Sequence, residues 1–215
     1  MINKVVEKIQ KEKVIAIVRG IAVDKIIDVA NALYEGGISL VEVTFNQKAP
    51  ETFVDTAKAI TLIKENCPQM TVGAGTVLTT EQVDIAKNAG AKFIISPDSD
   101  EQVIKYTVSQ GLVSIPGAYT PTEAKIAHQA GAHFVKLFPC TDASYLKALK
   151  APLSHIDVLA VGGVNVDNVA DFIKAGAVGV GIGSSLVKKE WVDNGEYEKI
   201  TQTAQRLLEN INGVK

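Results

Sequence analysis

A short apolar run followed by a segment of helical character recurs along the whole chain, and few folds accommodate such a repeat. Eight runs occur in the 215 residues, at 13–18, 39–45, 70–74, 92–96, 112–116, 133–138, 157–161 and 178–182. Their centres lie roughly 20 to 30 residues apart, which is the length of one strand–helix unit. The repeat therefore predicts parallel strands with helices packed against them.

The boundaries of the helical segments are marked in the sequence. Segments end on glycine before the next run, as at Glu35–Gly37 and Asn88–Ala91, where glycine supplies the left-handed residue that terminates a helix. Other segments begin with a capping hydroxyl, an acid or a proline, as at Thr79–Glu81 and Thr120–Glu123. These signals place one helix between successive strands.

Eight strands alternating with helices predict a single (β/α)8 TIM barrel domain over residues 1–215. Residues 2–11 are expected to form an extra N-terminal helix that closes the bottom of the barrel, and residues 196–211 the last helix. A doubly wound open sheet is the alternative. That fold would need a nucleotide fingerprint or a switch-point crevice, and no GxGxxG follows the first run.

Composition narrows the class of function. A net charge of −2 argues against a nucleic-acid binder, and 47% hydrophobic residues suffice for a sizeable core. No signal-peptide pattern and no run of 18 apolar residues occur, so we expect a cytoplasmic protein without a membrane partner. Cys67 and Cys140 are too far apart for a CxxC site, and the three histidines lack ligand spacing. We therefore expect neither a metal nor a cofactor.

Lys136 lies within the apolar run 133–138, which otherwise has the composition of a buried strand. Burial disfavours the charged ammonium and lowers the pKa of a lysine from about 10.4. A neutral amine attacks carbonyl groups. Taken alone, the run also suits a lysine at a strand end with its ammonium in solvent.

Glu42 interrupts the run 39–45 in the same way. Alternate strand residues point into a barrel, and active sites lie at the C-terminal ends of the strands. Glu42 and Lys136 are therefore expected to face the same interior. One interpretation is a structural ion pair. The other is a lysine that forms a Schiff base with a ketone, with Glu42 moving protons as a neighbouring C–C bond breaks.

Arg19 and two glycine-rich segments are further candidates for ligand binding. Arg19 ends the first run and offers a planar fork to a carboxylate or phosphate, although a surface helix-cap role is the alternative. The segments 161–164 and 181–185 follow the last two runs, where barrels commonly bind phosphate through backbone N–H groups. Tight turns alone would explain either segment, whereas the two together favour a phosphate site.

These motifs resemble the class I 2-keto-3-deoxy-6-phosphogluconate (KDPG) / 4-hydroxy-2-oxoglutarate (KHG) aldolase family over essentially the whole chain. The motifs that carry the resemblance occur in order at Glu42–Thr44, Val72–Val77, Ile95–Pro97, Ile115–Gly117, Val135–Pro139, Gly162–Val164 and Ile182–Ser184.

The resemblance implies that Lys136 is the Schiff-base lysine and Glu42 the general acid/base. It implies that Thr76, Pro97 and Phe138 line a pyruvate pocket. The residues implied for the phosphate are Gly162, Gly163, Gly183 and Ser184. Family members are typically metal-free homotrimers that split KDPG into pyruvate and glyceraldehyde 3-phosphate, and many also cleave KHG to pyruvate and glyoxylate.

Two positions depart from the commonest family pattern. Many members carry an arginine four residues after the glutamate, where this chain has Asn46, so Arg19 becomes the expected partner of the substrate carboxylate. The residue before the double glycine is often threonine and here is Val161. Both positions resemble the branch that acts on the 6-phosphogalactonate epimer, which is the alternative substrate because a lost hydroxyl partner alters discrimination.

Two other classes of function are compatible with the residues. One is a phosphate-binding barrel isomerase or epimerase that uses Glu42 as a base without covalent chemistry. The other is a barrel retained as a ligand-binding or assembly module, which would leave two inward-facing ionisable residues without a task.

Overall fold

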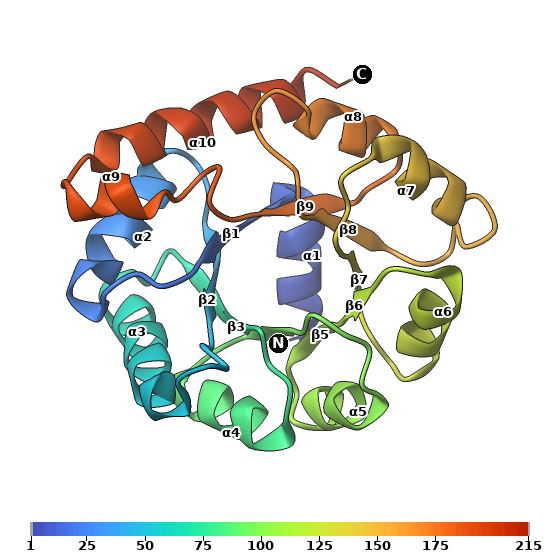
Figure 1. Cartoon of the computed structure of the whole chain (residues 1–215), viewed down its shortest axis with the longest axis horizontal. Coiled ribbons are helices and arrows are strands. Elements are labelled where there is room, and N and C mark those ends of the chain that lie inside the picture. Colours follow the sequence, from blue (N-terminus) through green and yellow to red (C-terminus); the bar gives the residue numbers. More distant parts are fainter. Residues whose placement is uncertain (1, 215) are drawn as a thin grey trace.

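The computed structural model describes residues 2–214 as a barrel of parallel strands ringed by helices (Figure 1). Neighbouring strands in the sheet follow the order β5-β4-β3-β2-β1-β9-β8-β7-β6, and every pair is parallel. The strands are β1 Val14–Val18, β2 Leu40–Thr44, β3 Thr71–Gly75, β4 Phe93–Ile95, β5 Val113–Ile115, β6 Gly117–Ala118, β7 Val135–Leu137, β8 Val158–Val161 and β9 Gly179–Ile182.

The two ends of the sheet, β5 and β6, follow one another in the chain and are separated by Pro116, the last residue of the predicted run 112–116. Proline has no N–H to donate, so it interrupts a ladder of backbone hydrogen bonds. Backbone bonds nevertheless continue across this edge: His133 N donates to Ser114 O at 3.0 Å, and Lys136 N donates to Pro116 O at 2.8 Å. Each of the eight predicted runs contributes one strand, the short β6 directly follows the run 112–116, and the (β/α)8 prediction is confirmed.

The helices begin and end where the sequence signals predicted. Thr79 accepts a hydrogen bond from Gln82 N at the start of α4, Thr120 forms a capping box with Glu123, and Gly90 ends α4 at φ 108°. Among residues 2–214, no helix is both long and apolar enough to cross a membrane. The helices are α1 Ile2–Glu12, α2 Ile26–Glu35, α3 Phe53–Asn66, α4 Thr80–Ala89, α5 Glu101–Ser109, α6 Pro121–Gln129, α7 Ala143–Lys150, α8 Val169–Lys174, α9 Lys189–Asp193 and α10 Tyr197–Asn212.

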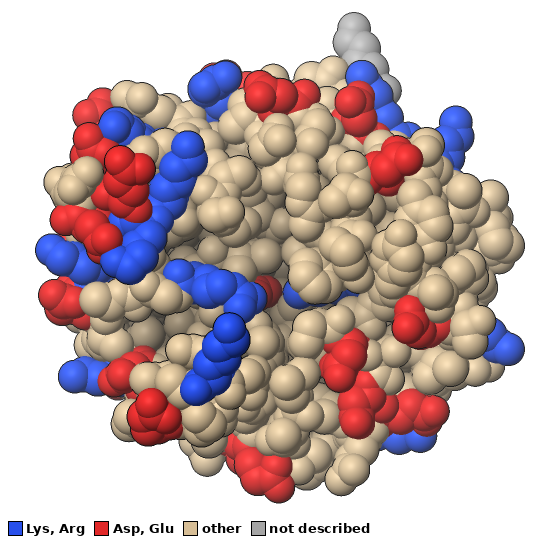
Figure 2. Space-filling model, viewed as in Figure 1, with Lys and Arg blue, Asp and Glu red and all other residues tan. Residues whose placement is uncertain are grey.

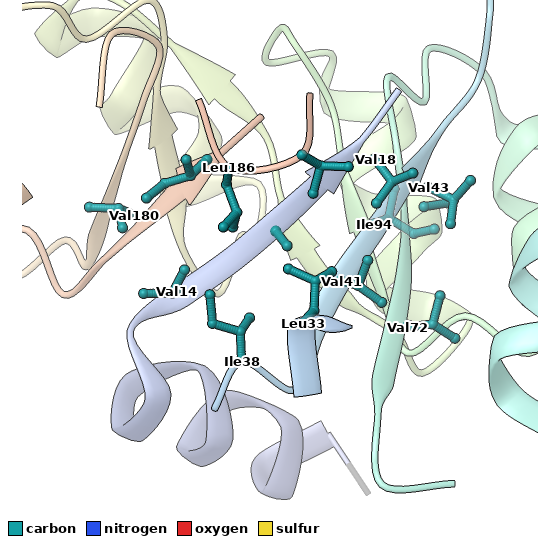
Figure 3. Packing of buried hydrophobic residues seen from close by; sticks show 14 of the residues in the cluster. Val14, Val18, Leu33, Ile38, Val41, Val43, Val72, Ile94, Val180 and Leu186 are labelled. Carbon is teal, nitrogen blue, oxygen red and sulfur yellow. The ribbon is translucent and has the colours of Figure 1, made fainter. Parts of the chain in front are cut away.

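Alternation along the strands separates the core into two apolar layers. Outward-facing residues pack between the strands and the helices, and Figure 3 shows part of this layer, including Val14, Val41 and Leu33. The inner layer fills the lower barrel together with Val5 and Ile9 of α1, which crosses that end (Figure 1). The extra N-terminal helix is therefore confirmed. The inner layer also contains Ile15, Leu40, Phe93, Ile95, Val113, Ile115, Phe134 and Leu159.

The same alternation leaves the upper barrel open. Two positions beyond Leu40 the inward-facing residue is Glu42, and two beyond Phe134 it is Lys136. On β9 the corresponding residue is Gly181, which lines the cavity described below. Bulky apolar side chains thus give way to ionisable side chains and glycine, and this change makes room for a ligand.

Candidate active site

A cavity of about 570 Å³ opens at the C-terminal ends of the strands. Figure 2 shows it as a hollow near the middle of this face, with basic and acidic atoms at its floor. It contains all but one of the predicted site residues, namely Arg19, Glu42, Thr76, Pro97, Lys136, Phe138, Gly162, Gly163, Gly183 and Ser184.

Asn46 is the predicted site residue that the structure does not bring into this cavity. It lines a separate depression on the outer side of β1 and β2, and its Oδ1 accepts a hydrogen bond from Lys48 N at 3.2 Å. The side-chain amide that was expected to bind substrate is therefore hydrogen-bonded within a local turn. This position leaves Arg19 as the cavity's guanidinium.

Lys136 rises from β7 into the cavity and is only 6% exposed. Its Nζ lies 4.5 Å from the centroid of the Phe138 ring. Burial lowers the pKa of Lys136, the positive charge of Arg19 lowers it further, and the negative charge of Glu42 opposes both. The environment therefore favours the neutral, nucleophilic amine more than water does.

Glu42 is 1% exposed, and burial raises the pKa of its carboxyl group against the opposing charges of Lys136 and Arg19. Its Oε2 has no hydrogen-bond partner among residues 2–214. The Glu42 carboxylate and the Lys136 ammonium do not form a contact salt bridge. The two groups therefore make no direct ion pair, although the charge of each shifts the pKa of the other, and the carboxyl group can hold or release a proton within the cavity.

Two glycines make this arrangement sterically possible. A side chain at Gly75, on β3, would overlap Glu42 Oε1. A side chain at Gly117, on β6, would overlap the backbone carbonyl of Pro97, which lines the cavity. Gly117 also pairs in register with Lys136. The backbone at Pro97 therefore packs against β6, the strand next to the one that carries the lysine. Both close approaches require the absence of a Cβ.

Arg19 and Thr76 are joined at the edge of the cavity. Arg19 Nη2 donates a hydrogen bond to Thr76 Oγ1 at 3.1 Å. Thr76 has φ 57°, a left-handed conformation that is unusual for a β-branched residue. Strained backbone of this kind persists only where surrounding contacts enforce it, and it is concentrated at functional sites.

A further side of the cavity, next to the end of β1, is formed by the predicted glycine-rich segments that follow β8 and β9. Gly162 and Gly163 have φ values of 97° and 85°, so both need the conformational freedom of glycine. Asn168 Nδ2 donates to Gly163 O at 2.8 Å, and Ser185 Oγ donates to Val164 O at 2.9 Å. These bonds fix the turn beside the backbone of the last strand.

Sequence reasoning did not assign several residues that line the cavity. Ile17 and Asn165 are examples. Ile17 lies two residues before Arg19 and pairs in register with Glu42, so strand periodicity would have found it. Asn165 lies in an irregular turn for which no such rule exists.

Comparison with known proteins places this geometry in a family. The profile described as KDPG and KHG aldolase matches residues 5–203. The 2-dehydro-3-deoxy-6-phosphogalactonate aldolase of Escherichia coli is 38% identical over 83% of this chain and 86% of its own.

Two solved structures are similar over most of their length. One, described as native KDPGal, has a TM-score of 0.83 and 34% identity and covers 94% of this chain and 95% of its own. The KDPG aldolase of Legionella pneumophila, with pyruvate captured as a covalent carbinolamine, has a TM-score of 0.81 and 27% identity, covering 91% and 94%. With its buried lysine and carboxyl group at the end of a barrel, this chain belongs to the KDPG and KHG aldolase family.

Proposed function

We propose that this protein is a Schiff-base aldolase that reversibly cleaves KDPG to pyruvate and glyceraldehyde 3-phosphate, and also KHG to pyruvate and glyoxylate. One observation carries the proposal: a buried amine and a buried carboxyl group share a cavity without contacting each other. The cavity that both groups line, about 570 Å³, has room for a keto acid.

The reaction begins when the neutral Lys136 amine attacks the C2 ketone and forms a carbinolamine. Glu42, which burial keeps prone to protonation, gives a proton to the C2 hydroxyl, and water leaves the iminium ion behind. The resulting carboxylate then removes the proton of the C4 hydroxyl. The C3–C4 bond breaks, its electron pair enters the iminium to give an enamine, and the aldehyde departs. Protonation at C3 and hydrolysis release pyruvate and the free amine.

The other residues of the cavity suit the two ends of the substrate. The Arg19–Thr76 pair offers a guanidinium and a hydroxyl to the pyruvate carboxylate. Phe138 and Pro97 supply apolar walls beside the methylene carbon. The phosphate is assigned to the loops that follow β8 and β9, at Gly162, Gly163, Gly183 and Ser184.

The test is covalent capture. Borohydride added with pyruvate should attach a reduced three-carbon adduct to Lys136, located by peptide mass spectrometry. The Lys136→Arg variant should show neither adduct nor pyruvate release, because arginine forms no imine. An active wild-type enzyme that stays unmodified would refute the mechanism, and Lys136→Arg activity would favour an isomerase or epimerase instead.

A second candidate substrate is the 6-phosphogalactonate epimer of KDPG. The 38% identity to the aldolase of E. coli that is named for this compound favours it. Val161 lies in the cavity where the commonest family pattern has threonine. Pyruvate release from both phosphorylated epimers and from KHG, measured in parallel, identifies the substrate. If Val161 selects the galactonate epimer, Val161→Thr shifts the ratio of the two kcat/KM values toward the gluconate form.

Assembly and location are further parts of the proposal. The family resemblance supports a homotrimer, which sedimentation of the purified chain would test. Both Cys67 and Cys140 are buried and unpaired, as suits a reducing cytoplasm. Fractionation of the source cells would test that location.

A further inference from the structure

Two glutamines behind the cavity form a hydrogen-bonded chain that ends on Thr76. Gln47 Nε2 donates to Thr76 O at 2.6 Å, and Gln47 Oε1 accepts from Gln82 Nε2 at 3.0 Å. Gln82 Oε1 in turn accepts from Leu78 N at 2.7 Å. Gln82 is 3% exposed, so its amide is held away from water at the start of α4.

These hydrogen bonds hold Thr76, the residue at the site whose backbone is strained. Thr76 at φ 57° has a branched side chain in a conformation that glycine prefers. The bond from Gln47 fixes the Thr76 carbonyl, while the Gln82–Leu78 bond fixes the backbone two residues later. Both ends of the strained turn are therefore restrained by side chains from outside the turn.

The position of Thr76 affects Arg19, which also lines the cavity. The Thr76 hydroxyl accepts from Arg19 Nη2, and Arg19 is itself exposed, so few other contacts hold its guanidinium. Gln47 and Gln82 do not line the cavity. They can affect a ligand only through the position of Thr76.

We infer that Gln47, supported by Gln82, is a positioning residue that holds Thr76 in its left-handed conformation and thereby orients the Thr76 hydroxyl and Arg19 toward the pyruvate carboxylate. The inference rests on the proposed function, since it requires pyruvate to bind at the Arg19–Thr76 pair.

The measurement is the pyruvate concentration that gives half-maximal borohydride trapping on Lys136. Gln47→Leu removes both bonds of the Gln47 amide, and Gln47→Glu keeps the acceptor for Gln82 but loses the donor to Thr76. Both variants should raise the half-maximal concentration about tenfold, as expected when a restraint on left-handed strain is lost. The trapping rate at saturating pyruvate should stay within about twofold, because Lys136 and Glu42 are untouched.

Thr76→Gly provides the internal check. Glycine adopts the same conformation without strain and removes the hydroxyl. Adding Gln47→Leu to Thr76→Gly should therefore change the half-maximal concentration by less than about twofold. The matched control is Gln102→Leu, whose side chain lies exposed on α5, and it should behave as wild type.

Partial misfolding would lower the amount of trapped protein but not the half-maximal concentration, so a loss of amount alone overturns the inference. Equal effects of Gln47→Leu in the wild-type protein and in the Thr76→Gly variant, or no effect in either, also overturn it. Wild-type protein that pyruvate and borohydride never modify would refute the proposed function as well.

Discussion

Replacement of Gly75 by alanine tests whether the position of Glu42 controls catalysis. The added Cβ would overlap Glu42 Oε1, lie 2.6 Å from Glu42 Cδ and lie 3.1 Å from Thr44 Cγ2. Non-bonded carbon atoms rest about 3.5 Å apart, so the carboxyl group must retreat by about 0.9 Å. A catalytic group displaced by about 1 Å can lose about 100-fold in rate. Overpacking also costs about 1 to 3 kcal/mol of stability.

The expected result is therefore a fall in kcat of about 100-fold, together with a modest loss of stability. The assay is pyruvate release at saturating substrate, paired with urea unfolding. The matched control is Gly73→Ala on the same strand, where the added Cβ would overlap the Phe93 ring in the lower apolar layer. Gly73→Ala should lose comparable stability but, while folded, keep kcat within about threefold of wild type.

Two results would refute this reasoning. A folded Gly75→Ala enzyme that retains nearly full kcat would show that the carboxyl group either tolerates displacement or takes no part in the slow step. An equal loss of kcat in Gly75→Ala and Gly73→Ala would show that general repacking of the barrel, rather than the contact with Glu42, limits the rate.

Three further predictions concern the pKa of Lys136, the reactivity of Cys140 and the dependence of activity on metal ions. The rate of pyruvate trapping should rise with pH to a plateau with a midpoint below 10.5, since burial lowers the pKa of Lys136. The Glu42→Gln variant removes a negative charge that raises this pKa, so it should move the midpoint to lower pH. An upward shift of the midpoint would contradict the assignment. Burial raises the pKa of Cys140 to about 11, so about one thiol in a thousand is ionised at pH 8 and a disulfide reagent should label Cys140 only after unfolding. Dialysis against EDTA should leave activity unchanged, because no three His, Cys, Asp or Glu side chains in the described part of the chain could share a metal ion; a loss that divalent cations restore would count against this.

The features that the sequence predicted well are those governed by a regular period. Inward-facing positions recur every second residue along a strand, so the sequence alone assigns Glu42 and Lys136 to one interior. Helix limits were predicted because a capping side chain such as Thr120, or a left-handed glycine such as Gly90, acts within one turn of the chain. The family resemblance added the irregular loops, including Pro97.

The features that escaped prediction depend on contacts between segments far apart in the sequence. The short strand β6 was not predicted; it begins directly after Pro116, where the predicted run 112–116 ends, and pairs with β7. Asn46 lies two residues beyond Thr44 at the end of β2 and was expected to face the cavity. Its side-chain oxygen instead accepts a hydrogen bond from Lys48 N in a local turn, and the side chain lines a separate depression. Gln47 and Gln82 are separated by 35 residues, and nothing in either segment indicates that their amides meet.

The interior of the barrel has an apolar lower half and an upper half that contains the cavity, and this division explains how the fold remains stable with two buried ionisable groups. Burying Glu42 and Lys136 without a contact salt bridge is unfavourable, because each charge loses hydration that its partner replaces only in part. The lower barrel offsets this with continuous apolar packing that includes Ile9 of α1 and Phe93 of β4. The unfavourable groups lie directly above this layer, since Glu42 is two residues beyond Leu40 and Lys136 is two residues beyond Phe134. The packing beneath the site therefore holds in place the strands that carry the two groups.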